Sequence, residues 1–179
     1  MDGQIIQEPM PKGKHSLLQT RLSAVLNGVL QPEQIAWAFV KLRCTVGGRS
    51  IVPDVTVLTW PRIPCDANGE IANAIDTHPD WVIEILSPDQ SQTRVTKNIL
   101  HCLHQGTQIG WLIDPDEQTV LVYSPPDQVK IFDQPTALLP TPAFAADFHL
   151  TVSELFGWLV IRPPAPKGGN LDTGYTINP

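Results

Sequence analysis

The stretch Trp81-Val-Ile-Glu-Ile-Leu-Ser-Pro88 is a short apolar run that contains a single charged residue, Glu84. In a β-strand alternate residues share a face, so Val82, Glu84 and Leu86 point to one side and the residues between them to the other. A carboxylate placed between two such apolar side chains is costly to desolvate without a partner. The run therefore predicts a buried strand whose one acid needs a specific contact.

The upstream stretch Ile51-Val-Pro-Asp-Val-Thr-Val-Leu58 offers a partner, because it also carries one acid, Asp54, within an apolar run. Two carboxylates on neighbouring strands can hold Mg²⁺, which takes hard oxygen ligands and usually keeps several waters. Such an ion activates a bound water and stabilises charge on a phosphodiester, with a lysine assisting. A structural alternative stays open, in which Asp54 hydrogen-bonds a bulge in its strand. Glu84 would then pair with Arg94 or Lys97.

Size and charge narrow the class of protein. The chain has 179 residues, of which 42% are hydrophobic, so it can bury one domain-sized core. Its net charge of −6 argues against tight nonspecific nucleic-acid binding, which depends on cationic contacts to phosphates. Basic residues nevertheless outnumber acids in residues 1–49, whereas residues 54–89 hold seven acids and only Arg62. One end of the molecule can therefore face phosphates while the middle holds a metal, although an uneven spread by chance explains the same counts.

The N-terminus and the cysteines indicate the compartment. Residues Met1-Asp-Gly-Gln4 lack the basic start and apolar stretch of a signal peptide, and no apolar run approaches a membrane span. We therefore expect a cytoplasmic protein with no membrane contact. The three cysteines are widely spaced without a Cys-x-x-Cys pair, which indicates neither a disulfide framework nor a zinc site, and Cys102 is expected in the core.

Hydrophobic spacing predicts a helix and then a hairpin in the first third of the chain. The helix is expected over residues 17–30, with Ser16 as its cap and Gln31-Pro32 at its end. The β-hairpin that follows turns at Val46-Gly-Gly-Arg49. Its second strand is expected to carry Asp54.

A βαβ-like unit is predicted in the middle of the chain. A long polar loop over residues 60–79 precedes the Glu84 strand, and loops of this length often lie beside functional sites. A helix is expected from about residue 92 to 105, closed by Gly106. The run Trp111-Leu-Ile-Asp114 then reads as a second buried strand, which completes the unit.

The last third is predicted to hold a hairpin, a short helix and a tail. The hairpin spans residues 120–132, and the helix lies within residues 150–157 with Thr151 as its cap. We therefore predict a single α/β domain over residues 1–162, a mixed sheet flanked by helices in the order helix, β-hairpin, strand, helix, strand, β-hairpin. A Pro/Gly-rich tail follows over residues 163–179.

The order of these motifs resembles the Uma-two family of bacterial proteins, within the PD-(D/E)XK, restriction-endonuclease-like superfamily. The resemblance covers roughly residues 3–158. It is carried by Val52-Pro-Asp-Val55, Val82-Ile-Glu-Ile-Leu-Ser-Pro88, the helix ending at Gly106 and Trp111-Leu-Ile-Asp-Pro115. The resemblance implies a restriction-endonuclease-like core in which Asp54 and Glu84 take the metal-binding positions.

The motif's lysine is where this chain departs from the superfamily. The lysine follows the acid by two positions, and here that position is Leu86. The Uma-two pattern moves the lysine onto the following helix, about eight residues before the glycine. Counting back from Gly106 gives Asn98, with Lys97 next to it and Arg94 one turn earlier as a second choice of cation. We assign Lys97 as the expected charge stabiliser.

The resulting hypothesis is a Mg²⁺- or Mn²⁺-dependent endonuclease acting on DNA, with Asp54 and Glu84 as metal ligands and Lys97 assisting. A homodimer is expected by analogy with the fold, with the hairpin at residues 119–132 or the tail as interface. The alternative is a binding or assembly module that keeps the nuclease fold without turnover. Hydrolysis of a small phosphate ester is a third possibility, because the metal chemistry is the same.

Three histidines could in principle take part in a site. His15 lies at the entrance of the first helix, where we expect a structural role such as local hydrogen bonding. His101 and His104 are three residues apart on the later helix, a spacing at which two imidazoles can share a metal. No third ligand is evident nearby, so we expect them to be surface residues.

Overall fold

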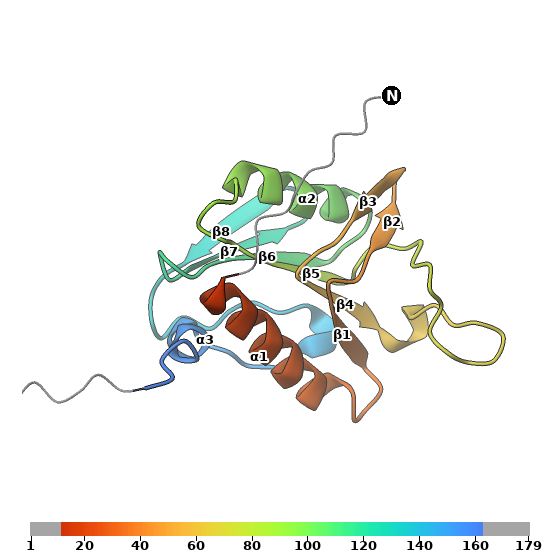
Figure 1. Ribbon diagram of the computed structural model, residues 1–179, viewed down its shortest axis with the longest axis horizontal. Helices are drawn as coiled ribbons and strands as arrows, with labels where there is room; N and C mark the ends of the chain where they lie inside the picture. The colour runs from red at the N-terminus through yellow and green to blue at the C-terminus, as the bar shows by residue number, and fades with distance from the viewer. Residues whose placement is uncertain (1–11, 163–179) are drawn as a thin grey trace, which may run out of the picture.

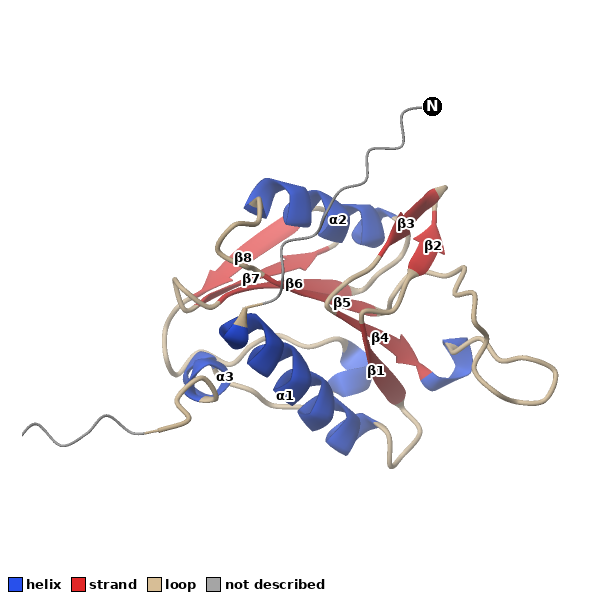
Figure 2. Ribbon diagram, in the orientation of Figure 1, coloured by secondary structure: helices blue, strands red, loops and turns tan. Residues whose placement is uncertain are grey.

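The computed structural model describes residues 12–162, which form a six-stranded mixed sheet between two helical layers (Figures 1 and 2). The strand order is β1-β4-β5-β6-β7-β8. The strands of this sheet are β1 (Ala36–Val40), β4 (Val55–Thr59), β5 (Trp81–Ile85), β6 (Ile109–Asp114), β7 (Thr119–Ser124) and β8 (Gln128–Phe132). Figure 1 shows α2 (Gln92–His104) on one face and α1 (Gly13–Leu30) with α3 (Val152–Gly157) on the other. This confirms the predicted fold class.

The predicted tail over residues 163–179 lies outside the described residues. Within residues 12–162, no helix has both the length and the apolar character that crossing a membrane requires.

The Glu84 strand, β5, lies in the interior of the sheet as its apolar run predicts. It pairs antiparallel with β4 and parallel with β6, and α2 connects the two parallel strands. Ile83 and its neighbours on the same face join the core beneath α1, whereas Val82 and Leu86 join the core beneath α2. The alternation of faces inferred from the sequence is therefore confirmed.

Helix boundaries are partly as predicted. Helix α1 ends at Leu30 with Gln31 as its C-cap, but it begins at Gly13, so the prediction of Ser16 as the cap is wrong. The residue at the N-cap is Lys12, whose side chain makes no capping hydrogen bond. The added turn carries His15, which is buried and contacts Asp54, so a tertiary contact extends the helix past the residue with the best capping chemistry.

The other helices follow their capping signals closely. In α2, Ser91 is the N-cap, and the chain leaves the helix at Gly106 with φ +112°, a conformation that favours glycine. Thr151 caps α3 in a capping box with Glu154, as predicted. The pKa of the Glu154 carboxyl lies below its ordinary value because the Thr151 hydroxyl and N–H both donate hydrogen bonds to it.

The segment that carries Asp54 differs from the prediction. The tight turn at Gly47 and Gly48 is confirmed, but it joins a separate two-stranded sheet of β2 (Cys44–Val46) and β3 (Arg49–Ile51). The expectation that Asp54 lies within the second strand of this hairpin is wrong, because Asp54 lies between β3 and β4. Pro53 has no N–H to donate to a ladder, which is consistent with a break between the two strands.

Cys102 lies in the core as predicted. It is buried beneath α2 together with Cys44, and both thiols are free. Burial, with the charge of Glu84 as a lesser cause, raises the pKa of the Cys102 thiol to about 12. The thiol therefore stays protonated and unreactive at neutral pH.

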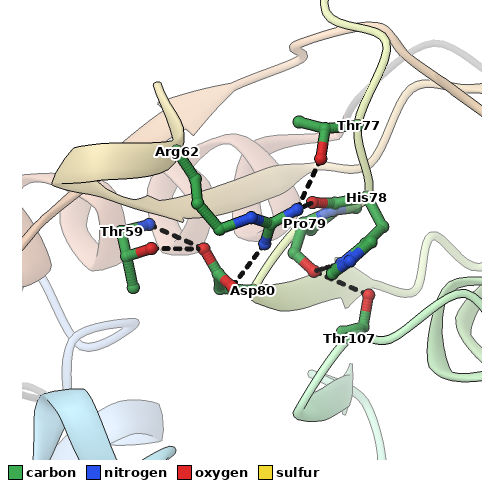
Figure 3. A network of polar contacts seen from close by, with 7 residues as sticks. All are labelled: Thr59, Arg62, Thr77, His78, Pro79, Asp80 and Thr107. Atoms are coloured by element: carbon green, nitrogen blue, oxygen red, sulfur yellow. Dashed lines mark hydrogen bonds and ion pairs between the residues drawn. The ribbon is translucent and has the colours of Figure 1, made fainter. Parts of the chain in front are cut away.

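A partly buried polar network around Asp80, at the start of β5, holds the 60–79 loop against the sheet (Figure 3). The Asp80 carboxylate accepts hydrogen bonds from the N–H of Thr59 at 2.8 Å and its hydroxyl at 2.9 Å, and it pairs with Arg62. The Arg62 guanidinium also donates to the Thr77 hydroxyl and to the carbonyl of His78. Asp80 thus fastens both ends of the loop.

Replacing Asp80 with alanine should lower the free energy of unfolding by about 2–3 kcal/mol, because it leaves the Thr59 donors and the Arg62 guanidinium without their acceptor. Chemical denaturation monitored by tryptophan fluorescence measures the change. Asp76→Ala removes an exposed carboxylate from the same loop and serves as the control, with an expected change within about 0.5 kcal/mol. Equal effects of the two substitutions would contradict the structural role of Asp80.

Candidate active site

Two carboxylates meet where the backbone ladder between β4 and β5 ends. The last paired residues are Val55 and Ile83. Just beyond them, the Ile85 N–H donates to Asp54 Oδ2 at 2.8 Å, and the Asp54 N–H donates to Glu84 Oε2 at 3.2 Å. Each acid therefore holds the backbone of the other segment. The acids lie together, as the strand pattern indicates. Asp54 also accepts a backbone hydrogen bond, which agrees in part with the alternative structural role considered for it.

Two nitrogen groups surround the Asp54 carboxylate. Lys41, which directly follows β1, places Nζ 2.7 Å from Oδ1. His15, in the first turn of α1, places Nε2 3.0 Å from Oδ2 and is buried. Because a carboxylate only accepts hydrogen bonds, the hydrogen of this contact belongs to Nε2. His15 thus has the structural contact expected of it, but its partner is a site residue.

Opposing effects set the pKa of Asp54. Burial raises this pKa, but the hydrogen bond and charge of His15 lower it, and so do the hydrogen bonds from Lys41 and the Ile85 N–H. The lowering effects prevail, and the pKa of Asp54 lies below its ordinary value of 3.8. The carboxylate is therefore ionised at neutral pH and available as an anionic ligand.

A cavity of about 250 Å³ opens beside the two acids, between the β2–β3 hairpin and α2. Asp54 and Glu84 line it together with three cationic side chains, those of Lys41, Arg49 and Arg94. The remaining lining residues are Ser50, Ile51, Val52, Gln90, Val95 and Asn98. The arrangement can hold a cation at the acids and a phosphate against the basic residues.

Helix α2 presents to this cavity residues other than the expected lysine. Arg94 and Asn98, four residues apart, share the face that lines the cavity. Asn98 Oδ1 accepts a hydrogen bond from Arg49 Nη2 at 2.5 Å. Lys97 is exposed and is not among the lining residues. The structure thus brings Asp54 and Glu84 together without Lys97, and the lysine beside them is Lys41.

No sequence motif marks Lys41 or Arg49 as a residue of the site. Both belong to the basic residues 1–49, whose charge indicates a phosphate-facing end but does not show which of them lie at the site. Lys41 has a positive φ of 51°, uncommon for a residue other than glycine, and its N–H donates to the Asp54 carbonyl at 3.2 Å. Neither the backbone conformation nor the contact is visible in the sequence.

His101 and His104 contact different parts of the molecule. His101 Nε2 donates to the carbonyl of Val46 at 3.0 Å, and His104 Nε2 lies 2.7 Å from Asp127 Oδ1. His104 is exposed and His101 half-buried. The two rings are thus engaged separately, as expected of surface residues.

The donor set at Asp54 and Glu84 suits a hard divalent cation. Both side chains supply carboxylate oxygens, and the adjoining cavity has room for an ion that keeps several waters, as Mg²⁺ does. Between residues 12 and 162 no group of three or more His, Cys, Asp or Glu residues is arranged to hold a metal, as a closed zinc site would need. The carboxylates therefore fit a hard divalent cation.

Comparisons with known proteins identify the family and the fold. A family model named Uma2 and described as "Putative restriction endonuclease" matches residues 1–153. The crystal structure of "a putative nuclease belonging to DUF820" from Anabaena variabilis ATCC 29413 is similar, with 59% sequence identity, 89% of each chain covered and a TM-score of 0.86. A search of curated proteins gave no match. The family and the fold inferred from the motifs are thereby confirmed.

The lowered pKa of Asp54 predicts how metal-free protein responds to acid. A carboxyl whose pKa is depressed by folding contributes stability above its unfolded pKa, and this contribution is lost as pH falls through the folded pKa. The difference in unfolding free energy between wild type and Asp54→Asn should therefore be constant above about pH 5 and shrink below about pH 4. Urea denaturation in EDTA across this range measures it, and a difference that stays constant down to pH 3 would contradict the prediction.

Proposed function

From the premise that the chain belongs to the Uma2 family, described as "Putative restriction endonuclease", we propose that it is a metal-dependent endonuclease that hydrolyses phosphodiester bonds of DNA. The observation that carries the proposal is the meeting of the Asp54 and Glu84 carboxylates in a cavity lined by three cationic side chains. Carboxylates suit the metal, and the cations suit the phosphate.

In this proposal Asp54 and Glu84 hold Mg²⁺ or Mn²⁺. When bound, the ion lowers the pKa of a water and stabilises negative charge on the phosphate. Water oxygen attacks phosphorus, the bond from phosphorus to one sugar oxygen breaks, and that oxygen takes up a proton. His15 and the Ile85 N–H keep Asp54 oriented, since both contact Oδ2 and leave Oδ1 facing Lys41.

We assign charge stabilisation to Lys41 rather than to Lys97. The Lys41 ammonium lies 2.7 Å from a carboxylate oxygen of Asp54, so a phosphate drawn to an ion on Asp54 would lie within its reach. Lys97 is exposed and lies outside the lining of the cavity. A lysine supplied by another strand can serve, because catalysis requires the charge at the phosphate and not a spacing in the sequence.

The second candidate function is a binding or assembly module that keeps the nuclease fold without turnover. Two observations favour it: Leu86 is buried in the core where the motif has lysine, and Lys41 contacts the Asp54 carboxylate that would hold a metal. A module of this kind would bind DNA in the cationic cavity and leave it intact. Activity measurements on matched variants separate the two functions.

Supercoiled plasmid incubated with Mn²⁺ should be nicked by the wild-type protein, and Glu84→Gln should abolish nicking. Lys41→Met should slow nicking by about 100-fold, the typical cost of removing one group that stabilises transition-state charge. Lys97→Met is the matched control and should change the rate by less than about 3-fold. Gel electrophoresis measures the rates, and circular dichroism verifies that each variant is folded.

Three other outcomes would change the assignment of the lysine, the function or the metal site. Loss of nicking in Lys97→Met with activity retained in Lys41→Met would restore the assignment made from the sequence. DNA binding without nicking by the wild-type protein would favour the binding module. Nicking that survives Glu84→Gln would exclude the proposed metal site.

We also propose a homodimer formed through the β7–β8 hairpin. Strand β8 is an edge of the sheet, and its side chains Val129 and Ile131 are 51% and 65% exposed. An edge strand with exposed apolar side chains can pair with another copy. Sedimentation velocity should show a dimer that Ile131→Lys dissociates, while Val160→Lys, at an exposed apolar residue after α3, leaves it intact. A monomeric wild-type protein would exclude the dimer.

A further inference from the structure

Both acids of the candidate site are buried, although a phosphodiester must come close to them. Asp54 is 2% exposed and Glu84 is 6% exposed. Phosphates lie on the outside of a duplex, with their own bases and the complementary strand behind them. They can contact protruding groups, but the duplex cannot enter a cavity of about 250 Å³. Access to the acids therefore depends on the walls of this cavity.

One wall of the cavity is formed by the β2–β3 hairpin, which is fastened to α2. His101 Nε2 donates to the carbonyl of Val46 at 3.0 Å on one strand of the hairpin. Arg49 Nη2 on the other strand donates to Asn98 Oδ1 at 2.5 Å. Both strands are thus tied to the same helix, and the walls of the cavity are closely held. A flexible single strand can enter such a space more readily than a duplex.

The cationic lining suits a strand backbone. Arg49 from the hairpin, Arg94 from α2 and Lys41 after β1 approach the cavity from three different elements. Guanidinium groups bind phosphate oxygens in a bidentate manner and keep their positive charge at neutral pH. The two arginines can therefore hold phosphates on either side of the one nearest the acids.

A second cavity, of about 330 Å³, has aromatic walls and lies along β1, the edge strand that precedes Lys41. Trp37 and Phe39 alternate along β1 in the direction of Lys41, and the ring centroids of Trp37 and Trp60 are 6.1 Å apart. Lys41 lies four positions after Trp37, a span of about 13 Å in extended chain. Aromatic side chains stack on bases that are not already paired and stacked in a duplex.

We infer that the substrate is a DNA strand with unpaired bases, whose backbone enters the cationic cavity while a neighbouring base stacks in the Trp37 cavity. The inference rests on the proposed function for the identity of the nucleic acid and extends it to the substrate class. Entry of an already unpaired strand avoids the cost of unstacking and unpairing, which an intact duplex would have to meet.

Fluorescence anisotropy tests the strand preference with the full-length protein and Ca²⁺ in place of Mg²⁺. The probes are a labelled single-stranded oligonucleotide, its blunt duplex and the same duplex with a single-stranded overhang. Single strand and overhang should bind at least about 10-fold more tightly than blunt duplex, the change expected from stacking of one base. Equal or tighter binding of blunt duplex, or no binding of any probe, would overturn the inference.

Variants test the two cavities separately. Trp37→Leu and Trp60→Leu should each weaken single-strand binding by about 10-fold, whereas Trp158→Leu, near Arg21 of α1, should leave it unchanged. Arg49→Gln should reduce the slope of log affinity against log salt by about 0.7, the value for one phosphate contact on a single strand. Equal losses in the Trp37 and Trp158 variants, or an unchanged slope, would overturn the assignments of these cavities.

Cleavage of the same three probes with Mn²⁺ distinguishes this inference from the proposed function. Preferential binding of unpaired strands without cleavage would leave the inferred strand preference standing and remove the nuclease proposal. Cleavage of blunt duplex at the rate of single strand would leave the nuclease proposal standing and overturn the inference.

Discussion

Two reciprocal hydrogen bonds between side chains and backbone, at the end of the β4–β5 ladder, hold the candidate site together. Backbone pairing stops at Val55 and Ile83, and beyond it the carboxylates accept the N–H groups of Ile85 and Asp54. A buried N–H without an acceptor costs about 1–3 kcal/mol, so the acids contribute to the fold as well as to the chemistry. This accounts for two carboxylates being tolerated in the interior, and it fixes their separation before any ligand arrives.

The charge of these acids determines what must surround them. Two carboxylates a few ångströms apart in a protein interior repel each other by about 4 kcal/mol at an effective dielectric constant near 20. His15 from α1 and Lys41 after β1 both contact Asp54. These contacts hold the start of α1 and the end of β1 beside the two acids. Asp54 and Glu84 would hold a divalent cation beside the Lys41 ammonium, which contacts Oδ1 of Asp54. The ion would supply positive charge at the acids, and Lys41 would supply it beside them.

The sequence predicted what depends on local pattern and left open what depends on distant contacts. Period-two alternation gave the faces of β5, and capping chemistry gave the end of α2 at Gly106 and the start of α3 at Thr151. The adjacency of Asp54 and Glu84 followed from two apolar runs with one acid each. The break before β4 and the buried network of Asp80 could not be read this way, because both depend on which segments meet in space.

The position of the lysine shows the same limit most clearly. In the motif the lysine lies on the acid's own strand or on the next helix, where a fixed spacing in the sequence fixes a position in space. On β5 the place is taken by Leu86, which packs beneath α2. On α2 the residues facing the cavity are Arg94 and Asn98, one turn apart, and Lys97 lies off that face. Strand β1 has no fixed distance in the sequence from Glu84. Its end nevertheless lies beside Asp54, because the Lys41 N–H donates a hydrogen bond to the Asp54 carbonyl. A cation from there satisfies the same electrostatic requirement, so the absence of lysine at the motif position does not by itself imply loss of the site.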